Sequence, residues 1–227
     1  MTTTAAPQRR TLADAVDRGC LYAHEHQLHF VSLIGSTPRW RLHPEMGTSH
    51  FEGRRTLDCD TQIIGVDKDG TWEWGWASPN VTPPRRIQAD LARQFGQARD
   101  MPVFTTARLA LEPGDARRLV VGAASIHRWW TSFAFGVDGM VMHAALRHPA
   151  LELPAPTPTT VRQTLDPSTW TVQPTDARRA VRAYAALRHL TRQERRDRTA
   201  MRLTWREGWT VTAHFTDDGQ LTHTTAS

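Results

Sequence analysis

The sequence predicts an α+β fold: a central antiparallel sheet covered by helices, then a C-terminal helix and a three-stranded antiparallel meander. Three observations predict this class. Apolar residues recur at helical spacing over residues 12–34 and 84–97, and a third helix is expected over 113–128. Two strand-like segments flank the turn at Asp67–Gly70, which is typical of a hairpin. Nine tryptophans and a hydrophobic fraction of 39% in 227 residues indicate a substantial packed core.

Two hairpins supply most strands of the predicted sheet. The first joins Thr56–Val66 to Thr71–Ser78, and the second joins residues 129–135 to 140–146 across a Gly-Val-Asp-Gly turn. Residues 38–53 add two weak strands. The three helices are expected to cover the tryptophan-bearing face of this sheet. In the second helix, one face carries three apolar residues: Ile87, Leu91 and Phe95.

Composition divides the chain into four parts. Residues 1–10 are expected to form a disordered leader, and residues 11–148 form the α+β domain. A Pro-rich linker covers residues 149–160. Residues 161–227 hold a basic helix and the meander, whose apolar residues alternate with polar ones. A unit this small is marginal alone, so we expect it to dock on the first domain.

The segment Trp72–Trp76 places three indoles on one face of its strand, because successive side chains alternate. Such a row either stacks on a planar ligand or belongs to the core. With a four-residue turn at Asp67–Gly70, Gly65 faces Trp72 and Ile63 faces Trp74. The indoles then share their face with three apolar residues: Leu57, Cys59 and Ile63. The pattern therefore favours a core role.

The same register collects polar residues on the opposite face: Asp58, Asp60, Gln62 and Glu73. Three carboxylates on adjacent strands repel one another unless a cation, a ligand or arginines offset their charge. A polar ligand site would use this face, and an enzyme would use two of the carboxylates as an acid/base pair. A solvated face paired with the abundant arginines is the alternative.

The C-terminal region is rich in arginine. The chain has a net charge of +5 and a pI near 10.2, and Lys68 is the only lysine. Residues 176–206 hold ten arginines and three acids. Nucleic-acid binding through Arg178, Arg182 and Arg192 is one interpretation of this stretch. A solvated helix in an arginine-biased protein is the other.

Several classes of protein are not indicated. The run His24–His29 lacks the His-Glu-x-x-His spacing of a zinc helix, so we expect no metal. Nucleotide-binding glycine loops, a Gly-x-Ser-x-Gly elbow and a Cys-x-x-Cys pair are missing from the sequence, so we expect no cofactor. Without a signal peptide or a membrane-length apolar run, a cytoplasmic protein with reduced Cys20 and Cys59 is expected.

The runs Gln62–Gly65 and Thr71–Pro79 carry a resemblance. They resemble an uncharacterised bacterial domain-of-unknown-function family, marked by a Trp-x-Trp-x-Trp-Ala-Asn strand. The resemblance covers about residues 12–147 and implies a leading helix with Gln27, this hairpin, and the helices and hairpin that follow. Ser78 stands where the family usually has Asn. The family implies no activity, so the function rests on the residues themselves.

The residues favour a non-catalytic binding protein for a small polar ligand or a partner protein. The polar face at Asp58, Asp60, Gln62 and Glu73 is its predicted site. An enzyme that uses carboxylates of this face is the first alternative, and His24 or His29 would lie near it. A nucleic-acid-binding protein that uses the arginine-rich tail is the second.

Overall fold

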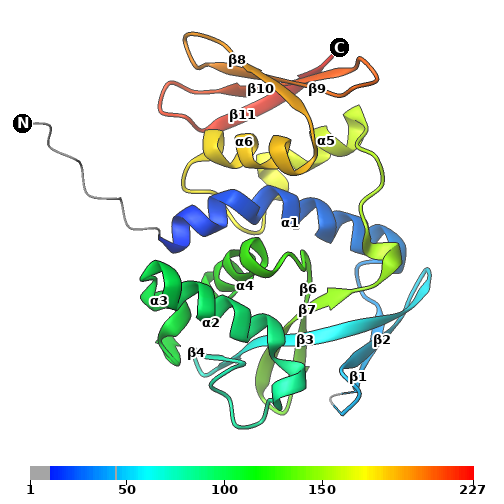
Figure 1. Cartoon of the computed structure of the whole chain (residues 1–227). Coiled ribbons are helices and arrows are strands. Elements are labelled where there is room, and N and C mark those ends of the chain that lie inside the picture. Colours follow the sequence, from blue (N-terminus) through cyan, green and yellow to red (C-terminus); the bar gives the residue numbers. More distant parts are fainter. Residues whose placement is uncertain (1–10, 44) are drawn as a thin grey trace, which may run out of the picture.

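A computed structural model describes residues 11–43 and 45–227; the predicted leader at residues 1–10 lies outside the described residues. One long helix, α1 (Leu12–Ile34), runs between two layers (Figure 1). A seven-stranded sheet with helices α2, α3 and α4 lies on one side of α1. Helices α5 and α6 with a four-stranded sheet lie on the other. The predicted α+β class is confirmed.

The large sheet is antiparallel and is built around one long strand, β3. This strand pairs with β2 near its start, with β4 near its end, and with β7 along its other edge. The sheet order is β1-β2-β3-β4-β5, with β6 pairing outside β7. The strands are β1 (Arg39–His43), β2 (Thr48–Glu52), β3 (Thr56–Lys68), β4 (Thr71–Trp74), β5 (Arg108–Ala110), β6 (Thr131–Val137) and β7 (Met140–Arg147).

The helices begin and end at recognisable signals. At the start of α1, the Thr11 hydroxyl accepts the Asp14 N–H and the Asp14 carboxylate accepts the Thr11 N–H, a capping box. Gly35 ends this helix with a φ of 91°, which favours glycine. The remaining helical segments of this layer are the 3-10 turn η1 (Pro83–Arg85), α2 (Ile87–Arg99), α3 (Pro102–Thr105) and α4 (Asp115–His127).

The C-terminal layer contains one strand more than predicted. Strands β9, β10 and β11 form the expected meander, and β8 adds to the edge at β9. All four residues of β8 are exposed and none is apolar, so no alternation marks it in the sequence. The elements are η2 (Pro149–Leu151), α5 (Pro158–Thr164), η3 (Pro167–Thr169), α6 (Ala177–Leu187), β8 (Thr191–Glu194), β9 (Ala200–Thr204), β10 (Thr210–Phe215) and β11 (Leu221–Ala226).

The three indoles of β4 and the turn after it belong to the core. Trp72 and Trp74 are fully buried, and Trp76 is 8% exposed. The Trp74 indole donates a hydrogen bond to the Val103 carbonyl at 3.0 Å, which satisfies its one polar group. Small residues of α2, the Phe104 ring of α3 and apolar residues of α4 pack around them. The core interpretation of this tryptophan row is confirmed.

The predicted register of the first hairpin is wrong by two residues. Lys68 pairs with Thr71 and Gly65 pairs with Trp74, so the turn holds only Asp69 and Gly70. Both turn residues have positive φ, 50° and 69°, as a tight hairpin turn requires. Strand pairing continues through Asp67 and Lys68, so the first two residues of the predicted turn belong to β3.

The shared face predicted for the indoles is also wrong. A bulge between Ile63 and Gly65 shifts the pairing of β3 with β7. Ile64 therefore packs with the tryptophans, whereas Ile63 packs in a separate cluster with Leu57 and Cys59. Aromatic residues Phe30, Phe51 and Phe135 complete that second cluster.

Helix α2 presents its small residues, not its large ones, to the core. Ala89 and Ala92 are fully buried, whereas Ile87 is 51% exposed and Leu91 is 40% exposed. The bulky indoles already fill this space, so only small side chains fit between the helix and the sheet. The sequence spacing located the helix but did not identify its packed side.

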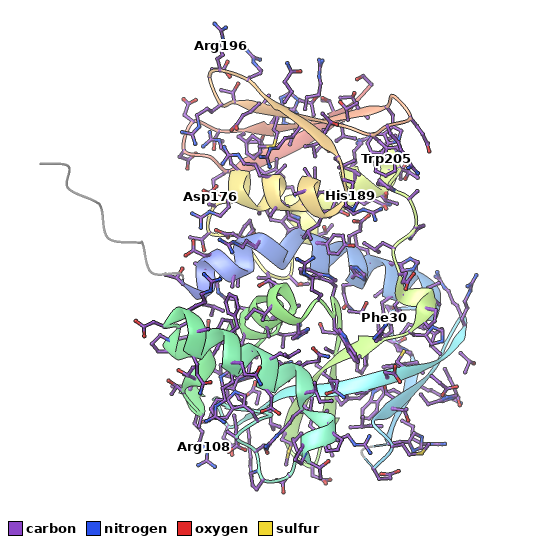
Figure 2. The ribbon with its side chains drawn as sticks, viewed as in Figure 1. Phe30, Arg108, Asp176, His189, Arg196 and Trp205 are labelled. Carbon is purple, nitrogen blue, oxygen red and sulfur yellow. The ribbon has the colours of Figure 1, made fainter. Side chains whose placement is uncertain are left out.

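Buried carboxylates join α1 to the C-terminal layer. The Asp17 carboxylate accepts the backbone N–H groups of Thr175 at 2.7 Å and Asp176 at 3.2 Å. Glu25 forms an ion pair with Arg188 at 3.1 Å, and both side chains are less than 10% exposed. Side chains fill the space on both sides of α1, with Phe30 toward the large sheet (Figure 2). The C-terminal unit is thus packed against the first domain.

Removal of a core indole tests the packing of the large sheet. In Trp74→Ala, the lost burial and the cavity left behind lower the free energy of unfolding by about 3–5 kcal/mol. Trp40→Ala is the matched control, because Trp40 is 38% exposed. Urea unfolding measures both variants. Equal losses would contradict the assignment of Trp74 to the core.

The buried ion pair gives a second stability test. Glu25→Ala leaves the Arg188 guanidinium buried without its carboxylate, which costs about 3–5 kcal/mol. Glu45→Ala is the control, since that side chain is 72% exposed. The double variant Glu25→Leu with Arg188→Leu is expected to regain most of the loss in urea unfolding. A double variant as unstable as Glu25→Ala would show that the ion pair itself is not the cause.

Candidate functional site

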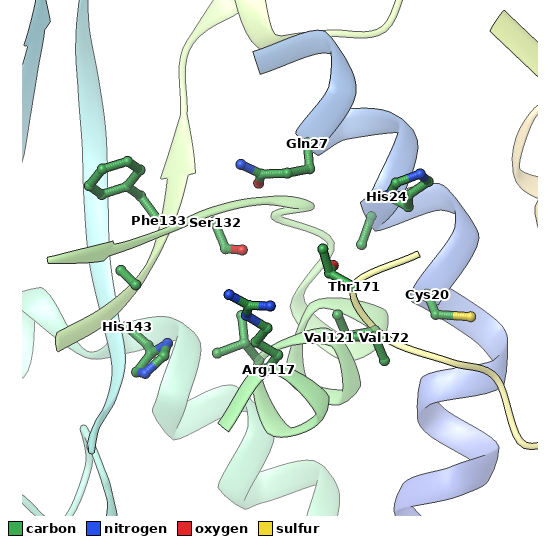
Figure 3. Close-up of a pocket in the computed structure, with 13 residues that line it drawn as sticks. Cys20, His24, Gln27, Arg117, Val121, Ser132, Phe133, His143, Thr171 and Val172 are labelled. Carbon is green, nitrogen blue, oxygen red and sulfur yellow. The ribbon is translucent and has the colours of Figure 1, made fainter. Parts of the chain in front are cut away.

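A cavity of about 300 Å³ lies between α1, α4, β6 and β7 (Figure 3). Its polar wall comes from separate elements. Gln27 lies on α1, Arg117 on α4, Ser132 on β6 and His143 on β7. Figure 3 shows Gln27, Ser132 and Arg117 turned toward the same space. Four elements distant in sequence therefore place an amide, a guanidinium, a hydroxyl and an imidazole around one cavity.

The rest of the wall is apolar and is completed by the C-terminal unit. Thr171 and Val172, which follow η3, line the cavity opposite β6 and β7. His24 of α1 bonds to the Thr169 hydroxyl at 3.0 Å and so ties this segment to the helix. The apolar lining consists of Cys20, Ala23, Val120, Val121, Phe133, Ala134 and Val172.

The electrostatics of the cavity favour an anion. Burial lowers the pKa of His143 and of His24, so both rings are neutral at physiological pH. Burial also raises the pKa of the Cys20 thiol to about 12. Within residues 11–43 and 45–227, no carboxylate lies within ion-pair distance of Arg117, and the cavity lining contains none. The site therefore carries one uncompensated positive charge.

The polar face predicted from the sequence is divided between three places. Asp58 and Asp60 are exposed on β3 and line a separate groove. Gln62 donates a hydrogen bond to the Pro84 carbonyl at 3.0 Å. Glu73 pairs with Arg108 at 2.8 Å and lies opposite Val66, six residues further along β3 than Asp60. The register shift separates Glu73 from the other three residues, and their role in ligand binding stays a prediction.

The three arginines of the nucleic-acid alternative make contacts within the C-terminal unit. Arg178 donates to the Arg198 and Thr216 carbonyls. Arg182 forms an ion pair with Glu194 at 2.7 Å. Arg192 donates to the Arg182 carbonyl at 3.5 Å. These contacts join α6 to the small sheet, so the three arginines contribute to the packing of the C-terminal unit.

The side chains of the histidine-rich run on α1 diverge. His24 faces the cavity, Glu25 pairs with Arg188, and His26 lines the separate groove. The His29 ring bonds to the Ala150 carbonyl at 2.9 Å. No group of three His, Cys, Asp or Glu side chains in the described part of the chain is arranged to hold a metal. Both cysteines, Cys20 and Cys59, are free and buried.

Sequence reasoning did not identify three of the polar residues of the cavity, although it named His24 as a candidate. Arg117, Ser132 and His143 each stand alone in a predicted helix or strand, with no motif around them. Gln27 entered only through the family resemblance. The one available signal was a polar residue on a half-buried element, and many solvated positions share that signal.

Comparison with known proteins shows the family to which the chain belongs. Residues 13–149 match DUF6882, a family of unknown function. The match spans more than half of the 227 residues, so the chain belongs to this family. No curated protein and no solved structure matches the chain significantly. Membership in an uncharacterised domain family is therefore confirmed.

The described helices are too short or too polar to span a membrane. Within the described ranges, none of them combines the length and the apolar character needed to cross a bilayer.

Buried histidines predict a loss of stability at acid pH. Burial lowers the pKa of His143 below 6.5, and lowers those of His26 and His127 to about 3 and about 4. Below pH 6.5 the unfolded chain binds protons on these rings while the folded chain does not. The free energy of unfolding therefore decreases as the pH is lowered. His143→Gln should make this dependence shallower, by up to about 1.4 kcal/mol per pH unit, in urea unfolding between pH 6.5 and pH 4.5. His189→Asn, at an exposed position, is the control. An unchanged slope in His143→Gln would contradict a neutral His143.

Proposed function

We propose that this protein is a non-catalytic binding protein that holds a small ligand with an anionic group in the cavity between α1, α4, β6 and β7. One observation carries the proposal: Arg117 enters a cavity whose lining supplies an amide and hydroxyls but no carboxylate among the described residues. A carboxylate or phosphate on the ligand would supply the missing negative charge and accept two parallel hydrogen bonds from the guanidinium.

The size and lining of the cavity limit the rest of the ligand. A volume of about 300 Å³ lies at the small end of the range for ligand pockets, so the ligand is a small molecule. Gln27 and Ser132 favour polar atoms near the anionic group. Val121, Phe133 and Val172 favour an apolar body on the other side.

The chemistry of the lining supports binding over catalysis. The Cys20 thiol, with a pKa of about 12, is a poor nucleophile at neutral pH. Ser132 has no hydrogen bond to a histidine within the described ranges, so no base activates it there. Neutral His143 and Gln27 suit recognition by hydrogen bonding. These groups orient a ligand, and among the described residues the cavity lining contains no carboxylate to pair with His143 or His24.

The setting of the protein also remains a proposal. The buried free thiols of Cys20 and Cys59 support a cytoplasmic protein with reduced cysteines, and its bacterial origin rests on the family resemblance alone. The Trp-x-Trp-x-Trp-Ala-Asn strand as a family mark, and a partner protein in place of the small ligand, likewise remain predictions. The concave shape of the cavity favours the small ligand.

Ligand stabilisation measures the proposed binding. Phenylacetate combines a carboxylate with an apolar ring of about the right size, and 2-phenylethanol is its uncharged counterpart. We expect millimolar phenylacetate to raise the thermal midpoint, because a ligand bound to the folded state stabilises it. We expect 2-phenylethanol to have a much smaller effect, because it leaves the Arg117 charge uncompensated.

A charge-removing variant tests the role of Arg117. Arg117→Gln should bind phenylacetate at least tenfold more weakly in titration calorimetry, while its own stability stays close to wild type. Arg99→Gln is the matched control, an exposed arginine in the last turn of the neighbouring α2. Equal affinities of Arg117→Gln and wild type would overturn the proposed site. If neither phenylacetate nor inorganic phosphate raises the thermal midpoint, the proposal of an anionic ligand is overturned.

A further inference from the structure

A second concave surface lies apart from the cavity and shares none of its lining residues. This groove has a volume of about 980 Å³. Tyr22 and His26 of α1 and Asp58 and Asp60 of β3 form two of its walls. The others are residues 127–131, which connect α4 to β6, and the chain after β7. Nothing in the proposed function uses this surface.

Aromatic side chains line one wall of the groove. Trp129 and Trp130 are both partly exposed, and Tyr22 meets Trp130 edge to face, with ring centroids 5.0 Å apart. The Arg147 guanidinium lies 5.9 Å from the centroid of the Trp129 ring. Partly exposed indoles beside arginines are suited to stack against a flat, π-rich ligand.

Two arginines in the groove have no acidic partner. Arg128 and Arg147 are both exposed, and in the described part of the chain neither lies within ion-pair distance of a carboxylate. Asp60 is the cross-strand neighbour of Arg147, yet the two form no ion pair. Arg128 caps α4 with a φ of 66°, a costly conformation for a residue with a side chain. Among the described residues, the groove thus presents two guanidinium groups and two carboxylates, Asp60 and Glu152, whose side chains form no hydrogen bond or ion pair.

Buried histidines behind the aromatic wall give an independent sign of a ligand site. The Trp129 N–H donates to His127 Nδ1 at 3.1 Å, so the neutral ring carries its proton on Nε2. That Nε2–H is buried and has no partner among the described residues, and His26 Nε2 is likewise buried without one. Both rings are more than 90% buried and line the groove. A buried polar atom needs a partner, and an ordered water, an ion or a ligand in the groove would supply one.

We propose that this groove binds a nucleoside phosphate, either free or as a nucleotide unit of a single strand. The base stacks on the indole of Trp129 or Trp130. The phosphate bonds to Arg128 and Arg147, and Asp60 accepts hydrogen bonds from sugar hydroxyls. This arrangement uses the unpaired charges of both signs, which a simple anion would not. It locates nucleotide recognition in the family domain, away from the C-terminal arginines.

Titration calorimetry with AMP tests the proposal on the intact chain. We expect AMP to bind, and adenosine and inorganic phosphate each to bind at least tenfold more weakly, because each lacks half of the contacts. Single-stranded oligoadenylate distinguishes the two sources: a strand that binds more tightly than AMP indicates a nucleic-acid ligand, and an equal or weaker one indicates a free nucleotide. Lack of AMP and oligoadenylate binding at low salt would overturn the proposal.

Matched variants locate the binding. Arg128→Asn removes the guanidinium and keeps a residue that tolerates positive φ, and Arg147→Gln removes the second charge. Each variant should bind AMP at least tenfold more weakly than the wild type. Arg198→Asn is the control, an exposed arginine with a φ of 61° in the C-terminal unit. Arg117→Gln should bind AMP normally, which separates this groove from the cavity. AMP affinity that is lost in Arg117→Gln but kept in both groove variants would overturn the proposal.

Discussion

The burial of α1 between two layers is the constraint on which the rest of the structure depends. Its apolar residues pack toward both sheets, so neither layer has a complete core without it. Its polar residues are bound as well: Asp17 accepts N–H groups that precede α6, and Glu25 pairs with Arg188. Because a buried carboxylate is costly without partners, these contacts hold the C-terminal unit in one orientation. The cavity and the groove both use α1 as a wall for the same reason.

Local patterns predicted the elements well and their long-range pairing less well. The bounds of α1 follow from its capping box, its apolar spacing and Gly35, which are all local. The bulge at Ile64 has no local mark, because it depends on how β7 pairs with β3. The buried side of α2 depends on the space that the indoles leave, so Ala89 and Ala92 face inward while Ile87 does not. Propensity cannot supply such information, since it arises only after the layers pack.

The site residues, like the strand pairing, depend on long-range contacts that local patterns do not show. The predicted polar face was built from neighbours along one hairpin, and a register change of two residues separated Glu73 from Asp60. The cavity instead collects single residues from four elements, so no spacing in the sequence joins Arg117 to His143. The groove is intermediate: residues 127–131 are consecutive, and Asp58 and Asp60 were identified on the strand that faces them. A site can therefore be predicted from sequence only when most of its residues lie in one continuous segment.

The cavity has walls from both the family domain and the C-terminal unit. The family match ends at residue 149, yet Thr171 and Val172 line the cavity and Thr169 bonds to His24. The guanidinium, amide and imidazole lie within the family domain, so the proposed anion recognition would belong to that domain. The wall formed by residues 171–172 belongs to the appended unit, which α6 attaches to α1. Under the proposed function, recognition of the anionic group and limitation of ligand size are assigned to different parts of the chain, so we expect a change in the appended unit to alter the second without altering the first.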